Sequence, residues 1–213
     1  MSKQYKNNKK CYNFYKKVVI KMKLILASNS KTRKEILNKV GLKYETVPSN
    51  IQEYSEKQNP KEYVIDLSQQ KAKAVEKNQK EGVILSADSI IYINNKKLEK
   101  PKTKEEAKSM LQNLSGKVNY AVTGVTIIDL YQNKQITFSE TTEVYFDKLT
   151  EEEIEWYINN EEYIFERCGY FISGKSALYI PKINGDYYNI LGMPINKVYK
   201  ELNKLGYKIS DFQ

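Results

Sequence analysis

The sequence contains no histidine, and this absence narrows the chemistry that the protein can perform. Without histidine there is no Ser-His or Cys-His nucleophilic pair and no histidine-rich zinc site. Any chemistry must therefore depend on carboxylates, lysine, arginine, tyrosine or hydroxyl groups. Cysteine is scarce as well. Cys11 and Cys168 form no CxxC pair, so nothing indicates a disulfide framework.

Long apolar runs are also missing. No run approaches the roughly 18 residues that a membrane-spanning helix needs. The basic N-terminus has only Val18–Ile20 and Leu24–Ala27 as short apolar stretches, so no signal peptide is convincing. These absences predict a protein of the reducing cytoplasm that does not contact the membrane. A length of 213 residues is enough for one domain with a substantial core.

Basic charge is plentiful but unevenly placed. The net charge is +9, yet residues 1–21 contain seven lysines and no acid, which leaves about +2 for the rest of the chain. We expect residues 1–21 to be a disordered basic N-terminal extension, or to lie upstream of a true start at Met22. Residues 22–208 should form the folded domain, with 209–213 as a C-terminal tail. A basic nucleic-acid-binding protein is kept as an alternative, although the nearly neutral domain disfavours a specific nucleic-acid partner.

Hydrophobic periodicity, turn residues and helix caps predict a mixed α/β fold. We expect strands over 23–28, 44–47, 83–93, 118–130 and 135–146. We expect helices over about 31–40 and 60–78, from Thr103 to Leu114, from Thr150 onward, and from Pro194 to Leu205. Asn184-Gly185 is typical of a tight hairpin turn, so strands are also expected over 177–183 and 187–190.

Asp88 lies in the most apolar stretch of the chain, within the expected strand over 83–93. A carboxylate there loses its hydration and persists only if a cation, a metal or several hydrogen-bond donors compensate. One interpretation is a local turn in which Asp88 caps its own backbone. The other is a catalytic or metal-holding carboxylate, and the rest of the chain favours it.

The first strand-to-helix turn has the features of an anion site. A helix that begins near Ser30 offers free N–H groups, and Arg33 and hydroxyl groups lie beside them, a combination that suits phosphate. The alternative is an ordinary surface helix in which Thr32 and Glu35 form a capping box.

Lys71 falls on the apolar stripe of the expected helix over 60–78. A lysine in this place either reaches along the surface to solvent or points at a carboxylate or a phosphate in a cleft. Lys100 and Glu53 carry no distinctive signal of their own.

Gly169–Ser176 matches the phosphate-binding P-loop pattern, GxxxxGK followed by serine. That motif needs a strand before it and a helix after it. Here a charged helical stretch precedes the segment and a strand-like segment follows it, and the variable positions are bulky. A P-loop NTPase or kinase is therefore kept only as an alternative.

Several short motifs, taken in order, resemble the Maf (septum formation inhibitor) family of nucleoside triphosphate pyrophosphatases. The resemblance runs from Met22 to about Tyr207. The matching segments are residues 24–37 (family pattern LASxSPRRxELL), 86–91 (GADTVV), 98–101 (LGKP), 114–116 (LSG), 122–125 (VTGV) and 184–194 (EGDYxNVVGLP).

The resemblance implies an elongated mixed sheet flanked by helices, with two lobes around a central cleft. It also implies hydrolysis of a nucleoside triphosphate to the monophosphate and pyrophosphate, removal of non-standard nucleotides and a link to cell-division arrest. A divalent cation, Mg²⁺ or Mn²⁺, and a homodimer are implied as well. The implied site residues are Asp88 as the proton acceptor, Glu53 and Asp88 as metal ligands, and Ser30, Arg33, Lys71 and Lys100 as phosphate-binding groups.

The chain departs from the family pattern where the substrate base is selected. Thr32, Ser89 and Ser173 fall at the implied specificity positions, and together they match neither the dTTP/UTP pattern nor the methylated-GTP pattern. The family's KAGAYGIQG is degraded near Cys168–Gly174. The preferred base is therefore left open by the sequence.

Overall fold

The computed structural model describes residues 22–94, 96–166, 168 and 170–213, and within them seven strands form one mixed sheet. The expectations for residues 1–21 lie outside the described residues. The strands are β1 (Leu24–Leu26), β2 (Glu45–Thr46), β3 (Val83–Ile93), β4 (Lys96–Leu98), β5 (Val118–Asp129), β6 (Lys134–Tyr145) and β7 (Lys182–Asn184). The helices are α1 (Lys31–Lys39), α2 (Pro60–Glu76), α3 (Lys104–Leu114), α4 (Glu151–Asn160), α5 (Tyr187–Ile190) and α6 (Ile195–Lys204), with 3-10 helices η1 (Lys175–Tyr179) and η2 (Ile209–Phe212). The predicted mixed α/β class is confirmed.

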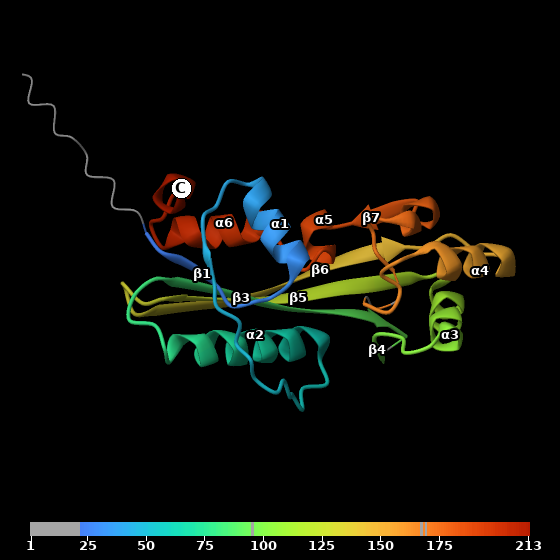
Figure 1. The fold of residues 1–213 in the computed structure, drawn as a ribbon, viewed down its shortest axis with the longest axis horizontal. Coiled ribbons are helices and arrows are strands. Elements are labelled where there is room, and N and C mark those ends of the chain that lie inside the picture. The colour runs from blue at the N-terminus through green and yellow to red at the C-terminus, as the bar shows by residue number, and fades with distance from the viewer. Residues whose placement is uncertain (1–21, 95, 167, 169) are drawn as a thin grey trace, which may run out of the picture.

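The sheet order is β2-β1-β3-β5-β6-β7, and β4 pairs with the end of β3. β1 runs parallel to β2 and β3, whereas the other pairings are antiparallel. The two longest pairings are β3 with β5 and β5 with β6, and these three strands run along the elongated body (Figure 1).

Helices cover the two ends of this sheet differently (Figure 1). At one end, α1 and α6 pack on one face through a core that includes Leu37 and Val198, and α2 packs on the other face through Ala72 and Val75. At the opposite end, α3 and α4 enclose a separate core with Ile164, Tyr170, Ile172 and Tyr179. Leu191 packs against the core under α1 and α6 and against this distal core, so it lies between the two lobes.

The close packing of α2 on the sheet depends on Gly124 in β5. A Cβ atom at this position would collide with the backbone of Val64 and Ile65, so only glycine lets the helix lie this close. The hydroxyl of Ser68 then meets that of Thr126 at 2.9 Å between helix and sheet. The contact fixes the height and the register of α2 above β3.

The prediction of a hairpin at Asn184-Gly185 is wrong. Only Lys182–Asn184 forms a strand, and it pairs with β6, while residues 175–179 form η1 and 187–190 form α5. The chain leaves β7 through Gly185, whose φ is +130°, and Asp186 then caps α5 by accepting the backbone N–H of Tyr188. Thr142 holds this corner, since its hydroxyl accepts from the Asp186 N–H and donates to the Asp186 carbonyl. A helix cap therefore replaces the second strand.

Residues 209–213, expected to be a tail, pack against the domain. Phe212 is buried in the core beneath α1 and α6, and the backbone of η2 accepts hydrogen bonds from Met22 and Lys43. The closing segment thus contributes to the folded unit.

Candidate active site

The candidate site begins at a gap in the edge of β3. β1 pairs with Val83–Leu85 and β4 pairs with Ile91–Ile93, so residues 86–90 lie between the two partners. Among the described residues, no strand pairs with this middle stretch on that side. Asp88 lies at the centre of the gap, in a strand whose bounds are those expected from the sequence.

Asp88 projects towards α2, where Lys71 meets it. The ammonium nitrogen of Lys71 lies 2.6 Å from Asp88 Oδ1 and 2.9 Å from Glu53 Oε2. Asp88 and Lys71 are 9% and 8% exposed, whereas the side chain of Glu53 is 43% exposed. The buried carboxylate is therefore compensated by a cation. The structure does not support the alternative of a local turn at Asp88.

Arg33 approaches the same gap from the other face of the sheet. Its guanidinium donates to the Gly192 carbonyl at 2.9 Å, to Ser28 Oγ at 3.2 Å and to Ser89 Oγ at 3.1 Å. Burial lowers the pKa of Arg33 below its usual value, while the negative charges of Asp88 and Glu53 act in the opposite direction. The guanidinium is thus held rigidly within the field of the two acids.

The start of α1 is capped by Ser30, whose hydroxyl accepts the backbone N–H of Arg33. The capping box suggested as an alternative for Thr32 and Glu35 is therefore wrong. Thr32 is instead buried within α1. Ser30, rather than Thr32, lines the cleft, and its phosphate-binding role stays a prediction.

Two hollows meet at the gap. The first is lined by Glu53, Lys71, Asp88, Ser89 and Lys100, together with polar residues of β4 and α3. The second is lined by Ser30, Arg33, Thr123 and Asn189 at a polar end, and by Phe171, Ile172 and Leu191 at an apolar end. Both are bounded by Ser89, Ile90, Lys100 and Cys168, so they form one continuous cleft between the lobes.

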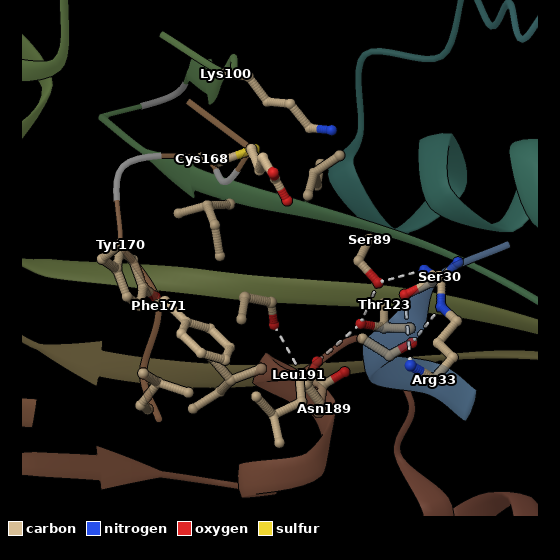
Figure 2. A pocket seen from close by; sticks show the side chains of 17 residues that line it. Ser30, Arg33, Ser89, Lys100, Thr123, Cys168, Tyr170, Phe171, Asn189 and Leu191 are labelled. Carbon is tan, nitrogen blue, oxygen red and sulfur yellow. Dashed lines mark hydrogen bonds between the residues drawn. The ribbon is translucent and has the colours of Figure 1, made fainter. Parts of the chain in front are cut away.

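Figure 2 shows the second hollow, with Lys100 and Cys168 on one side and Ser30 and Arg33 on the other. Two hydroxyl groups, of Ser89 and Thr123, are hydrogen-bonded in series along its wall. Ser89 Oγ lies 2.9 Å from Thr123 Oγ1, and the Thr123 hydroxyl donates to the backbone carbonyl of Asn189 at 3.0 Å. This series of hydrogen bonds links Arg33 to α5 across the sheet.

The structure brings most of the predicted site residues together, but not all of them. Asp88, Glu53, Lys71, Lys100, Arg33, Ser30 and Ser89 line the joined hollows. Thr32 and Ser173 line neither, since Thr32 is buried in its helix and Ser173 is exposed on the loop before η1.

The lining residues that were missed from the sequence include Cys168, Thr123 and Asn189. Burial raises the pKa of the Cys168 thiol, so this side chain is a neutral wall of the cleft at ordinary pH. Thr123 and Asn189 each lie in a segment that matches a family motif. Neither carries a charge, and a single sequence gives no sign that either would face a cleft.

The P-loop interpretation of Gly169–Ser176 is not supported. Gly169 lies outside the described residues, and the following Tyr170 and Ile172 are buried in the distal core. The Lys175 N–H donates to the carboxylate of Glu161, which is 6% exposed. An internal acid thus faces the backbone that would have to bind phosphate, and repulsion would exclude a bound anion.

Glu53 and Asp88, the two expected metal ligands, both line the first hollow. Among the described residues there is no cluster of three or more histidine, cysteine, aspartate or glutamate side chains that could hold one. The two acids nevertheless converge on one cation, the Lys71 ammonium. Two carboxylates suit Mg²⁺, which takes its remaining ligands from water and substrate phosphates. In the described part of the chain, no helix is long and apolar enough to cross a membrane.

Comparison with known proteins gives matches along almost the whole folded region. Residues 23–205 match the family described as Maf-like protein. The chain is 42% identical over 186 residues to a dTTP/UTP pyrophosphatase of Carboxydothermus hydrogenoformans, covering 87% of this chain and all of that one. It is 38% identical over 187 residues to a dTTP/UTP pyrophosphatase of Fusobacterium nucleatum, covering 88% of this chain and 97% of that one. Among solved structures, the Ham1 protein of Staphylococcus aureus overlaps 58% of this chain and 71% of its own, with a TM-score of 0.42 and 12% identity.

Proposed function

The chain belongs to the Maf-like protein family, and from this premise we propose that it hydrolyses nucleoside triphosphates to the monophosphate and pyrophosphate. The observation that carries the proposal is the position of Asp88. This acid is buried at the unpaired edge of β3, beside Lys71, in the wall of the first hollow. A buried carboxylate that opens onto a cleft lined also by Arg33, Lys71 and Lys100 suits a site that activates water next to a polyphosphate.

The cationic groups of the cleft would bind the triphosphate. Arg33 enters from one face of the sheet and Lys71 from the other, and Lys100 borders both hollows. A guanidinium and two ammonium groups can neutralise charge on the phosphates and stabilise the charge that develops as the anhydride bond breaks. The Ser30 hydroxyl lies beside Arg33 and would add a hydrogen bond.

Asp88 would accept a proton from the attacking water. Lys71 occupies Oδ1, so we expect Oδ2 to take the proton. Water adds to phosphorus, and the linkage between the α- and β-phosphates breaks. The monophosphate and pyrophosphate are the products.

A divalent cation, Mg²⁺ or Mn²⁺, is part of this proposal. Asp88 and Glu53 would hold it, because their oxygens already converge on one positive charge. Such a cation supplies charge neutralisation at the phosphate oxygens and lowers the pKa of bound water. Lys71 would then shift from the carboxylates towards the phosphates.

The second hollow would receive the nucleoside. Its apolar end, with Phe171, Ile172 and Leu191, suits a flat base, and its polar end meets the phosphate-binding Arg33. We propose dTTP and UTP as substrates, because the relatives at 38–42% identity are named for them. Specificity roles for Thr32 and Ser173 stay predictions that their positions outside the hollows do not favour.

Two further expectations belong to the proposal. A cytoplasmic location follows from the substrate, since nucleoside triphosphates are made and used there. A homodimer is expected from the family resemblance alone, and light scattering of the purified protein would test it.

The test is pyrophosphate release from a panel of normal and modified triphosphates, with Mg²⁺ or Mn²⁺ present. We expect equal amounts of monophosphate and pyrophosphate from dTTP and UTP, and chelation should stop the reaction. Release of orthophosphate and a nucleoside diphosphate instead would contradict the proposed bond cleavage.

A further inference from the structure

Glu53 lies in the middle of a long loop that joins β2 to α2. Residues 47–59 form neither helix nor strand, and connections of more than about 12 residues without secondary structure are uncommon and usually functional. The two ends of the loop are fixed, since the Val47 N–H donates to the Leu26 carbonyl at 3.0 Å and Asn59 caps α2. Glu53 is remote from both ends, so its place in the cleft depends on contacts that the loop makes along its length.

Two consecutive residues of α2 hold this middle part of the loop. The Lys71 ammonium lies 2.9 Å from Glu53 Oε2, and the Gln70 side-chain amide donates to the backbone carbonyl of Tyr54 at 2.7 Å. A carbonyl oxygen only accepts, so the NH₂ end of the Gln70 amide is the one that meets Tyr54. Among the described residues, the other hydrogen bonds of residues 50–58 join neighbours within the loop. The loop is thus held to α2, which it passes on its way to the start of that helix (Figure 1).

The two contacts respond differently to a bound metal. Under the proposed function, a metal between Asp88 and Glu53 would take the place of the Lys71 ammonium, and Lys71 would move to the phosphates. The Gln70 contact ends on a backbone carbonyl, so neither carboxylate has to give it up. Gln70 lines neither hollow of the cleft, so it makes no direct contact with a substrate bound there. Gln70 therefore acts on the site only through the loop.

Building on the proposed function, we propose that Gln70 is a positioning residue that keeps the carboxylate of Glu53 at the metal site after Lys71 has moved away. A carboxylate that is already held in place binds a cation more tightly than one whose loop must first be ordered, because the ordering costs free energy. Contacts just outside the ligands commonly adjust how tightly a metal is held. Without the amide donor of Gln70 the metal itself would have to order the loop, and metal binding would be weaker.

The experiment compares Gln70→Met with the wild type. The substitution nearly keeps the length of the side chain and suits a helix, but it removes the donor. Calorimetric titration of the nucleotide-free protein gives the Kd for Mn²⁺, and we expect this Kd to rise by roughly threefold to tenfold, as the loss of one exposed hydrogen bond allows. The kcat for UTP at saturating Mn²⁺ should stay within about twofold of the wild-type value, because the bound metal then holds Glu53 in place.

Gln69→Met is the matched control. The Gln69 amide donates to Thr137 on β6 and has no contact with the loop, so this variant should keep the wild-type Kd. Trypsin cleavage after Lys57, which is exposed in the loop, measures the attachment of the loop without any turnover. Gln70→Met should be cut faster than the wild type and Gln69→Met should not.

The outcomes separate this inference from the proposed function. If the wild type turns over no triphosphate, the proposed function fails, whereas the Mn²⁺ titration and the trypsin cleavage still test Gln70. An unchanged Kd in Gln70→Met, an equal rise in Gln69→Met, or a wild type that binds no Mn²⁺ would overturn the inference. Gln70→Ala also lacks the donor and should give the same result, so the test does not depend on how well one variant folds.

Discussion

Asp88 pairs directly with Gly124 across β3 and β5, and Gly124 is the point where α2 lies closest to the sheet. Side chains of a helix lean towards its N-terminus, so Lys71, further along α2, extends back towards the acid. The Asp88–Lys71 contact is therefore a consequence of how closely the helix packs. A change at Gly124 should affect both folding and chemistry.

We predict that Gly124→Ala destabilises the fold by about 1–3 kcal/mol or more, since the added methyl group meets the backbone of Val64. Activity of the folded fraction should fall as well, because α2 must move away from β3. Urea unfolding and pyrophosphate release measure the two effects. Ser139→Ala, at the paired position on β6, is the control and should be nearly neutral. A Gly124→Ala protein with wild-type stability and wild-type activity would contradict the close packing of α2 on β5.

Lys71→Met should leave Asp88 and Glu53 without their shared cation. Because Lys71 and Asp88 are buried, we expect a loss of about 3–5 kcal/mol in the free energy of unfolding. Adding Mg²⁺ or Mn²⁺ should restore part of that stability, since the two carboxylates can then share a metal.

Lys73→Met tests the same substitution on the exposed face of α2, where the lysine pairs with Glu76. It should change stability by less than about 0.5 kcal/mol. Similar losses in the free energy of unfolding of the two variants, measured by urea unfolding, would show that the buried contact stabilises the fold no more than the exposed one.

Arg33→Lys should weaken substrate binding although the charge is kept. The guanidinium contacts Gly192, Ser28 and Ser89 with three different nitrogens, and a single ammonium cannot span them. We expect kcat/KM for the triphosphate to fall by roughly 10–100-fold. Lys34→Arg, one residue further along α1, should have almost no effect. A loss of activity in both variants would assign the effect to α1 as a whole.

The central part of the site could be predicted because charged residues occur in apolar contexts. Asp88 in a β-branched strand and Lys71 on an apolar helical stripe are both charged groups in apolar surroundings. Each offsets the cost of burying the other, because the two form an ion pair. Such conflicts are visible in one sequence.

The end of the cleft proposed to bind the base could not be predicted in the same way. Asn184-Gly185 favours a hairpin locally, yet contacts between Thr142 and Asp186, 44 residues apart, start a helix there instead. The side chain of Asn189 takes its direction from that helix and from its hydrogen bonds to Ala121 and Thr142, far away in the chain. Only tertiary contacts set its orientation, so no local pattern could reveal it.

Tyr207 predicts a response to alkaline pH. Its hydroxyl donates to the buried carboxylate of Asp129 at 2.9 Å, and burial is the main factor that raises the pKa of Tyr207 to about 12. A raised pKa means that the folded state favours the neutral phenol. Its contribution to stability is therefore complete below the unfolded pKa of about 10 and is lost as the pH rises towards about 12.

Tyr207→Phe should remove this part of the pH dependence. At neutral pH we expect a loss of about 1–3 kcal/mol, because Asp129 Oδ2 loses its donor. Between pH 10 and 12 the free energy of unfolding should then fall less steeply than in the wild type. Urea unfolding across this range measures the slope. Parallel curves for the two proteins would show that Tyr207 does not titrate in this window.

The most direct test is the turnover of Asp88→Asn, measured together with nucleotide binding and thermal unfolding. The substitution keeps the size of the side chain but removes the proposed proton acceptor and one proposed metal ligand. We predict that pyrophosphate release falls by at least about 1,000-fold, while the protein still unfolds cooperatively and still binds the triphosphate through Arg33 and Lys100. Wild-type turnover in a folded Asp88→Asn protein would contradict the account.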